Sequence, residues 1–175
     1  MRMRRHLFSA AAVAAAGLAA AGCTAPKSSG PSGGSKSTKV HIAFFGYAAA
    51  NAYTQAALTG VKKVAARYGA TVHFYDPNMN STTQVAQIQD AATSGKYNAM
   101  VVYSVDGTAV PAAVRQALSN KIAVVADFVP IGPNIDTPAI QVQGVAGSVV
   151  VPIDQTGTDA GKLIAAACQG VNPCQ

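Results

Sequence analysis

The chain has 175 residues and a formal net charge of +6, from 13 Lys and Arg against 7 acidic residues. Six of the basic residues precede residue 40 and every acid follows it, so the rest of the chain is formally neutral. A neutral domain offers no basic patch for a phosphate backbone, which argues against a nucleic-acid-binding protein. The chain contains no Glu, so no Glu general acid is available, and this argues against an enzyme.

Residues 1–22 have the pattern of a lipoprotein signal peptide. Three arginines lie among the first five residues, and an uncharged, mostly apolar run covers Leu7–Ala21. That run is shorter than the about 20 apolar residues that span a bilayer and fits a secretory signal. Small residues then lead into Cys23, in a pattern similar to a bacterial lipobox, which implies acylation of Cys23. The alternative is an ordinary signal peptide cut near Ala-x-Ala, with Cys23 incidental.

The segment after Cys23 is poor in bulky apolar residues. Thr24–Lys39 consist largely of Ser, Gly, Pro and Lys, a composition that predicts a flexible linker. Residues 23–39 are therefore expected to form a lipidated Cys and its linker. Residues 40–175 then form one unit of domain size.

Five apolar runs, rich in β-branched residues, recur about 25 to 30 residues apart in this unit, which is the length of a βαβ repeat. They are continuous rather than alternating, as expected for strands covered on both faces. The predicted strands are Val40–Phe45, Thr71–Tyr75, Ala99–Ser104, Ile122–Asp127 and Ser148–Ile153.

Helical patterns fill the gaps between the runs. The first helix is expected to end at Gly69, and the second to begin with a capping box at Ser81–Gln84 and to end at Gly95. The third is expected to begin near Thr108, and the fourth at Asp154 or Thr156. Their apolar stripes comprise Leu58, Val61, Ala65 and Tyr68; Val85, Ile88 and Ala92; Val114, Ala117 and Leu118; and Ala160, Leu163, Ile164 and Ala167.

This alternation predicts an α/β fold, a doubly wound parallel sheet with strand order 2-1-3-4-5. In such sheets ligands bind beyond the carboxyl ends of the strands, at the switch point between strands 1 and 3. Residues 131–147, rich in Pro and Gly, are expected to form a loop or a short hairpin.

The usual signatures of cofactor and metal chemistry are missing. The loop after the first run is neither a dinucleotide fingerprint nor a P-loop, so no cofactor is expected. His41 and His73 lie within predicted strands, which suits hydrogen-bonded core or edge histidines better than metal ligands.

The stretch Val40–Gln169 resembles the N-terminal lobe of the ribose/galactose-type periplasmic sugar-binding proteins, the type I solute-binding proteins of ABC importers. The resemblance rests on the element order and on the loops at the strand ends. It implies a binding protein rather than an enzyme, which clamps a sugar or similar polyhydroxylated molecule between two lobes by hinge closure.

The resemblance also implies ligand-binding residues. Asn51 would bond a ligand hydroxyl and Tyr53 would stack on a ring; alternatively, Asn51 only caps the first helix and Tyr53 packs inward. Asp106 would accept ligand hydroxyls, or cap the third helix. Asp127 would bind ligand or belong to the hinge. Phe128 stands where many relatives carry a ligand-binding Arg, and would form an apolar wall.

Cys168 and Cys174 follow the last helix. In an exported protein their proximity in sequence favours a disulfide over a metal site, because no His or further Cys lies nearby.

These features together predict a solute-binding protein held by lipid on the extracytoplasmic face of the cell membrane, serving an ABC permease. The alternative is a ligand-sensing receptor for a membrane signalling partner. We expect the second lobe to be absent from this chain, either because the sequence is a fragment or because the gene product is truncated. We therefore expect one lobe alone to bind its ligand weakly.

Overall fold

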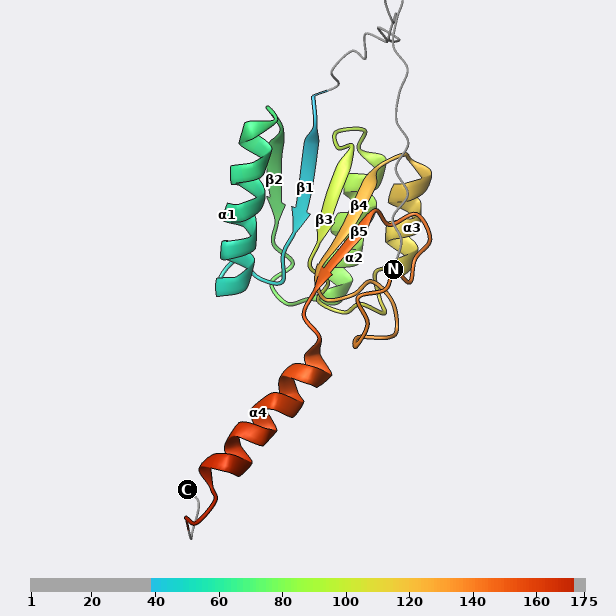
Figure 1. Ribbon diagram of the computed structural model, residues 1–175. Helices are drawn as coiled ribbons and strands as arrows, with labels where there is room; N and C mark the ends of the chain where they lie inside the picture. Colours follow the sequence, from blue (N-terminus) through green and yellow to red (C-terminus); the bar gives the residue numbers. More distant parts are fainter. Residues whose placement is uncertain (1–38, 172–175) are drawn as a thin grey trace, which may run out of the picture. The chain divides into compact units, whose positions relative to one another are not determined.

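The computed structural model describes residues 39–171, in which strands and helices alternate along the chain (Figure 1). The predicted signal peptide, the predicted acylation site Cys23 and Cys174 lie outside the described residues. The strands are β1 (His41–Phe45), β2 (Thr71–Tyr75), β3 (Ala99–Val102), β4 (Ala123–Phe128) and β5 (Gly147–Val150). The helices are α1 (Ala52–Arg67), α2 (Ser81–Thr93), α3 (Pro111–Ser119) and α4 (Ile153–Ala167).

The five strands form one parallel sheet in the order β2-β1-β3-β4-β5, which confirms the predicted α/β fold and strand order. The register aligns the carboxyl ends of the central strands: Phe45 pairs with Val102, and Val102 pairs with Ala126. The loops that follow β1, β3 and β4 therefore begin at the same edge of the sheet.

The main core lies between the sheet and the helices α2 and α3. Alternate strand residues such as Phe45, Val102 and Val124 join Ile88 of α2 and Val114 of α3 in one buried cluster. Because successive strand side chains point to opposite faces, Phe44 lies on the other face, where α1 packs over the β1–β2 side of the sheet. Phe44 is fully buried, and its ring centroid lies 6.0 Å from that of Phe74.

Two predicted helix starts were wrong. The capping residue of α2 is Asn80, whose side chain accepts a hydrogen bond from the Thr83 amide at 2.8 Å, so Ser81 is already helical. The expected capping box does not form because Gln84 is buried and bonded elsewhere. Helix α3 begins at Pro111 rather than near Thr108, with Pro in the first turn where its missing N–H costs nothing.

The last strand and helix also differ from expectation. Strand β5 ends at Val150 rather than at Ile153, because Pro152 has no N–H to donate and its extended backbone precedes the first turn of α4. Helix α4 accordingly begins at Ile153, ahead of both expected starts. Residues 131–146 contain no helix or strand, so the loop rather than the hairpin alternative holds.

The predicted α1 stripe is buried at Leu58 and Ala65 but not at Tyr68, and the predicted α4 stripe is not buried. Tyr68, expected on the inner face of α1, is 82% exposed, because it follows the last turn of a helix that covers only part of the sheet. Helix α4 has no buried residue, although Leu163 and Ile164 were expected to face inward. Between residues 39 and 171, no helix is both long and apolar enough to cross a membrane.

Candidate ligand-binding site

Gln84 of α2 fixes the backbone at the ends of two neighbouring strands. Its side-chain amide is fully buried and donates to the carbonyl oxygens of Gly46 and Tyr103, both at 2.9 Å. Its carbonyl oxygen accepts from the Val105 amide at 2.8 Å. One side chain thus joins the end of β1 to the end of β3. This is the switch point of the sheet, where ligands bind in folds of this kind.

Four aromatic rings gather at this edge and form an aromatic wall, which we define as Tyr47, Tyr53, Tyr103 and Phe128. The ring centroids of Tyr53 and Phe128 lie 4.2 Å apart, and those of Tyr103 and Phe128 lie 4.9 Å apart. Tyr47 stacks on Tyr103 at 5.5 Å. The loops after β1 and β3, the first turn of α1 and the end of β4 each supply one ring, so the wall exists only in the folded chain.

Phe128 joins the wall through an unusual backbone conformation. Its φ of 61° lies in the left-handed region, which is costly for a residue with a large side chain. Such strain persists only where surrounding packing holds it, and it concentrates at functional sites. Here the packing comes from the rings of Tyr53 and Tyr103.

Asp127 lies beside this wall at the end of β4, with 9% of its surface exposed. The Tyr53 hydroxyl donates to its Oδ1 at 3.2 Å, whereas its buried Oδ2 has no hydrogen-bond partner. Burial raises the pKa of the Asp127 carboxyl above its ordinary value, although the Tyr53 bond acts in the opposite direction. Burial and the neighbouring carboxylate raise the pKa of Tyr53 to about 12, so its phenol stays a donor at neutral pH.

An unpartnered oxygen on a buried carboxylate calls for a donor, because buried polar atoms are nearly always hydrogen-bonded. The Ser104 hydroxyl at the end of β3 is also buried without a partner. Flat rings next to unsatisfied oxygens suit a small molecule that has an apolar face and hydroxyl or amine donors.

The structure gives the remaining predicted site residues local roles. Asn51 is the N-cap of α1, where its Oδ1 accepts from the Thr54 amide at 2.9 Å. Asp106 is exposed in the loop after β3 and accepts from both the hydroxyl and the amide of Thr108. These two bonds lower the pKa of Asp106. The predicted capping of α3 by Asp106 is wrong, because this aspartate closes a turn that precedes the helix.

The structure thus brings Tyr53, Asp127 and Phe128 into one site, while the side chains of Asn51 and Asp106 serve a helix cap and a turn. Sequence reasoning missed Tyr47, Tyr103 and Gln84. The signal for Tyr103 was its place at the end of a predicted strand, and that for Gln84 was a polar residue on the apolar side of a helix.

Within residues 39–171, no group of three or more His, Cys, Asp or Glu side chains is arranged to hold a metal ion. Cys168 is disulfide-bonded. Because Cys174 lies beyond the described residues, the Cys168–Cys174 pairing stays a prediction.

A parallel sheet with a carboxylate and aromatic rings at the carboxyl ends of β1, β3 and β4 is the arrangement expected of a ligand-binding α/β lobe. The chain belongs to the periplasmic binding protein domain family, whose model matches residues 42–171. This confirms the family resemblance drawn from the sequence. Among curated proteins, no sequence matches the chain.

Solved structures share this fold at low sequence identity. LsrB from Clostridium saccharobutylicum, in complex with AI-2, is 22% identical with a TM-score of 0.61, covering 77% of this chain and 39% of its own. An ABC transporter solute-binding protein from Clostridium phytofermentans with bound β-D-glucose is 18% identical with a TM-score of 0.60, covering 74% and 37%.

A Mycobacterium smegmatis protein in complex with β-D-fucofuranose is likewise 18% identical with a TM-score of 0.61, covering 75% of this chain and 41% of its own. The chain therefore spans about two fifths of the length of these structures. The family and its solved members are solute-binding proteins rather than enzymes.

Proposed function

We propose that this chain is the ligand-binding lobe of a lipid-anchored solute-binding protein that delivers a sugar or similar polyhydroxylated molecule to an ABC importer. The observation that carries the proposal is the buried Asp127 carboxylate beside the aromatic wall, with one oxygen unpartnered. A carboxylate oxygen accepts hydroxyl donors strongly, because charge-assisted hydrogen bonds are the stronger kind.

The aromatic wall supports the same class of ligand. Tyr and Phe rings offer flat apolar surfaces to the C–H face of a sugar ring while a neighbouring acceptor binds its hydroxyls. The residue after Asp127 is Phe128, where the family resemblance leads one to expect an Arg. The site therefore favours neutral ligands over anionic ones, since a carboxylate or phosphate would meet the charge of Asp127. The sugars bound by several solved relatives support this choice.

The anchor and the importer rest on the sequence. The sequence has a lipobox-like pattern that ends in Cys23, followed by a linker-like segment. Both suit a receptor that is held near its permease on the extracytoplasmic face of the cell membrane. Two or more acyl chains would hold it there stably.

Nuclear magnetic resonance tests the ligand class, because it detects the weak binding expected of one lobe. The ¹⁵N-labelled chain is titrated with D-glucose, D-fucose and L-rhamnose, and we expect at least one sugar to shift the amide signals of Tyr103, Val105 and Phe128. Asp127→Asn should weaken that binding by roughly 10- to 100-fold, the loss expected when one charge-assisted hydrogen bond is removed.

Asp90→Asn is the matched control, because Asp90 is an exposed aspartate on α2. The proposal fails if none of the sugars shifts these signals, or if Asp127→Asn binds as tightly as Asp90→Asn.

A further inference from the structure

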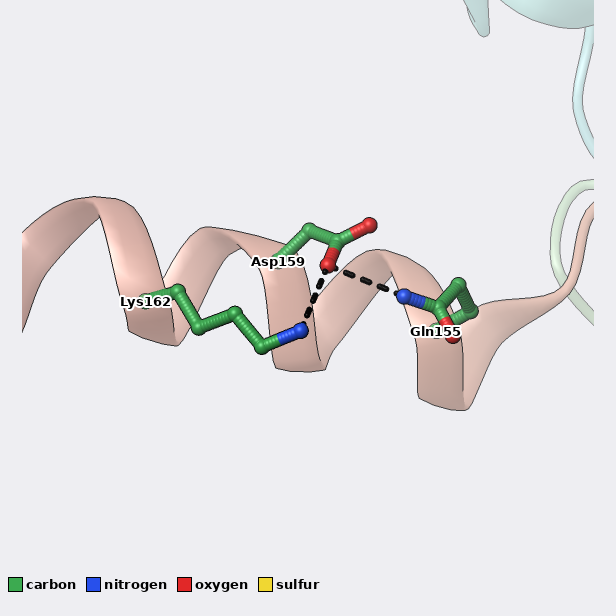
Figure 2. Close-up of polar contacts among 3 residues, drawn as sticks. All are labelled: Gln155, Asp159 and Lys162. Atoms are coloured by element: carbon green, nitrogen blue, oxygen red, sulfur yellow. Dashed lines mark hydrogen bonds and ion pairs between the residues drawn. The ribbon is translucent and has the colours of Figure 1, made fainter.

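Asp127 is a buried carboxylate without a basic partner. Its side-chain partner is the neutral phenol of Tyr53, and its Oδ2 has none. Within residues 39–171 the one ion pair lies elsewhere, on the exposed helix α4, where Lys162 meets Asp159 at 3.3 Å and Gln155 donates to the same oxygen (Figure 2). Aspartates are seldom buried unless a positive charge is paired with them. The described residues therefore leave the charge of Asp127 uncompensated.

The exposed charges of the lobe are divided between the two edges of the sheet. Between residues 39 and 171, the loops that follow the carboxyl ends of the strands contain Asp76, Asp106 and Asp136 but no Lys, Arg or His. Asp136 belongs to this edge because its Oδ1 accepts from the Asp154 amide, just after β5, at 3.2 Å. At the opposite edge, basic residues precede the amino ends of β1, β3 and β4: Lys39, Lys96 and Lys121.

This division gives the ligand-binding edge a negative potential, which attracts cations. Charges on exposed side chains are screened over about 8 Å at physiological salt, so the three loop aspartates steer a cation rather than hold it. Asp127 differs from them, because a charge pair in a buried site is screened far less than one at the surface.

The aromatic wall also suits a cation. The face of a Tyr or Phe ring is the negative end of its quadrupole and attracts a cation within about 6 Å of the ring centroid. The centroids of Tyr53 and Phe128 lie 4.2 Å apart, and the Tyr53 hydroxyl lies 3.2 Å from the Asp127 carboxylate. A cation at this place can therefore meet a carboxylate and ring faces together.

We infer that the polyhydroxylated ligand of this site carries a protonated amine, as an amino sugar or an amino-alditol does, and that this amine pairs with Asp127. The inference rests on the proposed function, since it narrows the ligand class of the same site. A sugar hydroxyl would give Oδ2 a hydrogen bond, but only a cation would also neutralise the buried charge. The raised pKa of Asp127 agrees with a missing counter-charge, because a neighbouring cation would lower it.

Matched neutral and amine-bearing ligands test this inference on the native chain. The ¹⁵N-labelled chain is titrated at pH 7 with D-glucose and D-glucosamine, D-galactose and D-galactosamine, and D-glucitol and 1-amino-1-deoxy-D-glucitol. In at least one pair we expect the amine to bind about tenfold more tightly than its neutral counterpart, the gain of a charge-assisted over a neutral hydrogen bond. N-acetyl-D-glucosamine, which has no charge, should lack this advantage over D-glucose.

Asp127→Asn tests whether Asp127 holds the amine. The substitution keeps an acceptor oxygen and removes the charge, so the amine and its neutral counterpart should then bind about equally, at whatever affinity remains. Asp90→Asn, the exposed control, should leave their ratio unchanged. The ratio compares two ligands on one variant, so a general loss of affinity does not alter its meaning.

The outcomes separate this inference from the proposed function. Equal binding within every pair by the native chain overturns the inference, while the observed binding of neutral sugars leaves the proposed function standing. Absence of binding by all six compounds overturns both. An amine preference that survives Asp127→Asn overturns the inference as well, since another group would then hold the amine.

Discussion

The buried carboxylate of Asp127 lowers the stability of the fold at neutral pH but offers an acceptor to a ligand. Its carboxyl is 9% exposed, and burial raises its pKa, which means that the folded chain disfavours the charged form. A raised folded pKa stabilises the fold fully only below the unfolded pKa of about 3.9. That stabilisation is lost as the pH rises through the folded pKa, so at neutral pH the charge weakens the fold. A donor from a ligand would offset this cost.

We therefore expect Asp127→Asn to unfold at higher urea concentration than the native chain at pH 7. The amide oxygen of Asn still accepts from Tyr53, while the buried charge is gone. The gap in urea midpoint should narrow as the pH falls through the raised pKa of Asp127, where its carboxyl becomes protonated. Asp90→Asn, an exposed change, should show neither effect. A less stable Asp127→Asn at pH 7 would contradict this account.

At the scale of elements, local patterns predicted which segments form strands and helices, and the bounds of β2, but not the bounds of every element. Continuous apolar runs identified each strand of the described residues, because a strand that is buried on both faces needs apolar side chains at successive positions. The end of β5 was missed because strand propensity at Val151 and Ile153 is overridden by Pro152 between them. The expected capping box at Ser81–Gln84 failed because tertiary contacts recruit the Gln84 side chain.

Gln84 shows how much one helix contributes to the site. Gln84→Met keeps the side-chain volume but leaves the carbonyls of Gly46 and Tyr103 and the Val105 amide without their partner. Each unsatisfied buried group costs about 1–3 kcal/mol. We expect a loss of roughly 3 kcal/mol in the free energy of unfolding, measured by urea denaturation.

Gln89→Met on the exposed face of the same helix is the control and should change stability by less than about 0.5 kcal/mol. Equal effects of the two substitutions would show that Gln84 does not anchor the strand ends.

At the scale of the whole molecule, the sequence predicted the sheet order and the family, but only part of the site. Tyr53, Asp127 and Phe128 were expected from the family resemblance and do come together. Tyr47 and Tyr103 were missed because ring contacts join distant segments, and no local pattern records which loops meet. The exposure of α4 was missed for a related reason. An apolar stripe on a helix predicts that this side is buried, but it does not identify the surface on which the helix packs.

The predicted anchor is also a property of the whole molecule. A chain free in solution would diffuse away from the proposed permease. A linker with the composition of Thr24–Lys39 would give an anchored lobe a reach of about 20–25 Å by random-coil statistics. Such a reach would let the lobe dock on a membrane partner while it stays anchored. The charge of the lobe itself, formally neutral beyond residue 39, offers no electrostatic substitute for the lipid.

Cys23→Ser should therefore move the protein from the membrane fraction to the soluble fraction of a bacterial host. Only the sulfur of Cys23 can form the thioether bond to the lipid, and the Ser hydroxyl cannot form that bond. Metabolic labelling with a palmitate analogue should mark the native chain and Cys168→Ser, which keeps Cys23, but not Cys23→Ser. Membrane attachment would be refuted if the native chain were unlabelled and soluble. If Cys23→Ser stayed membrane-bound after a salt wash, some other part of the chain would hold it there.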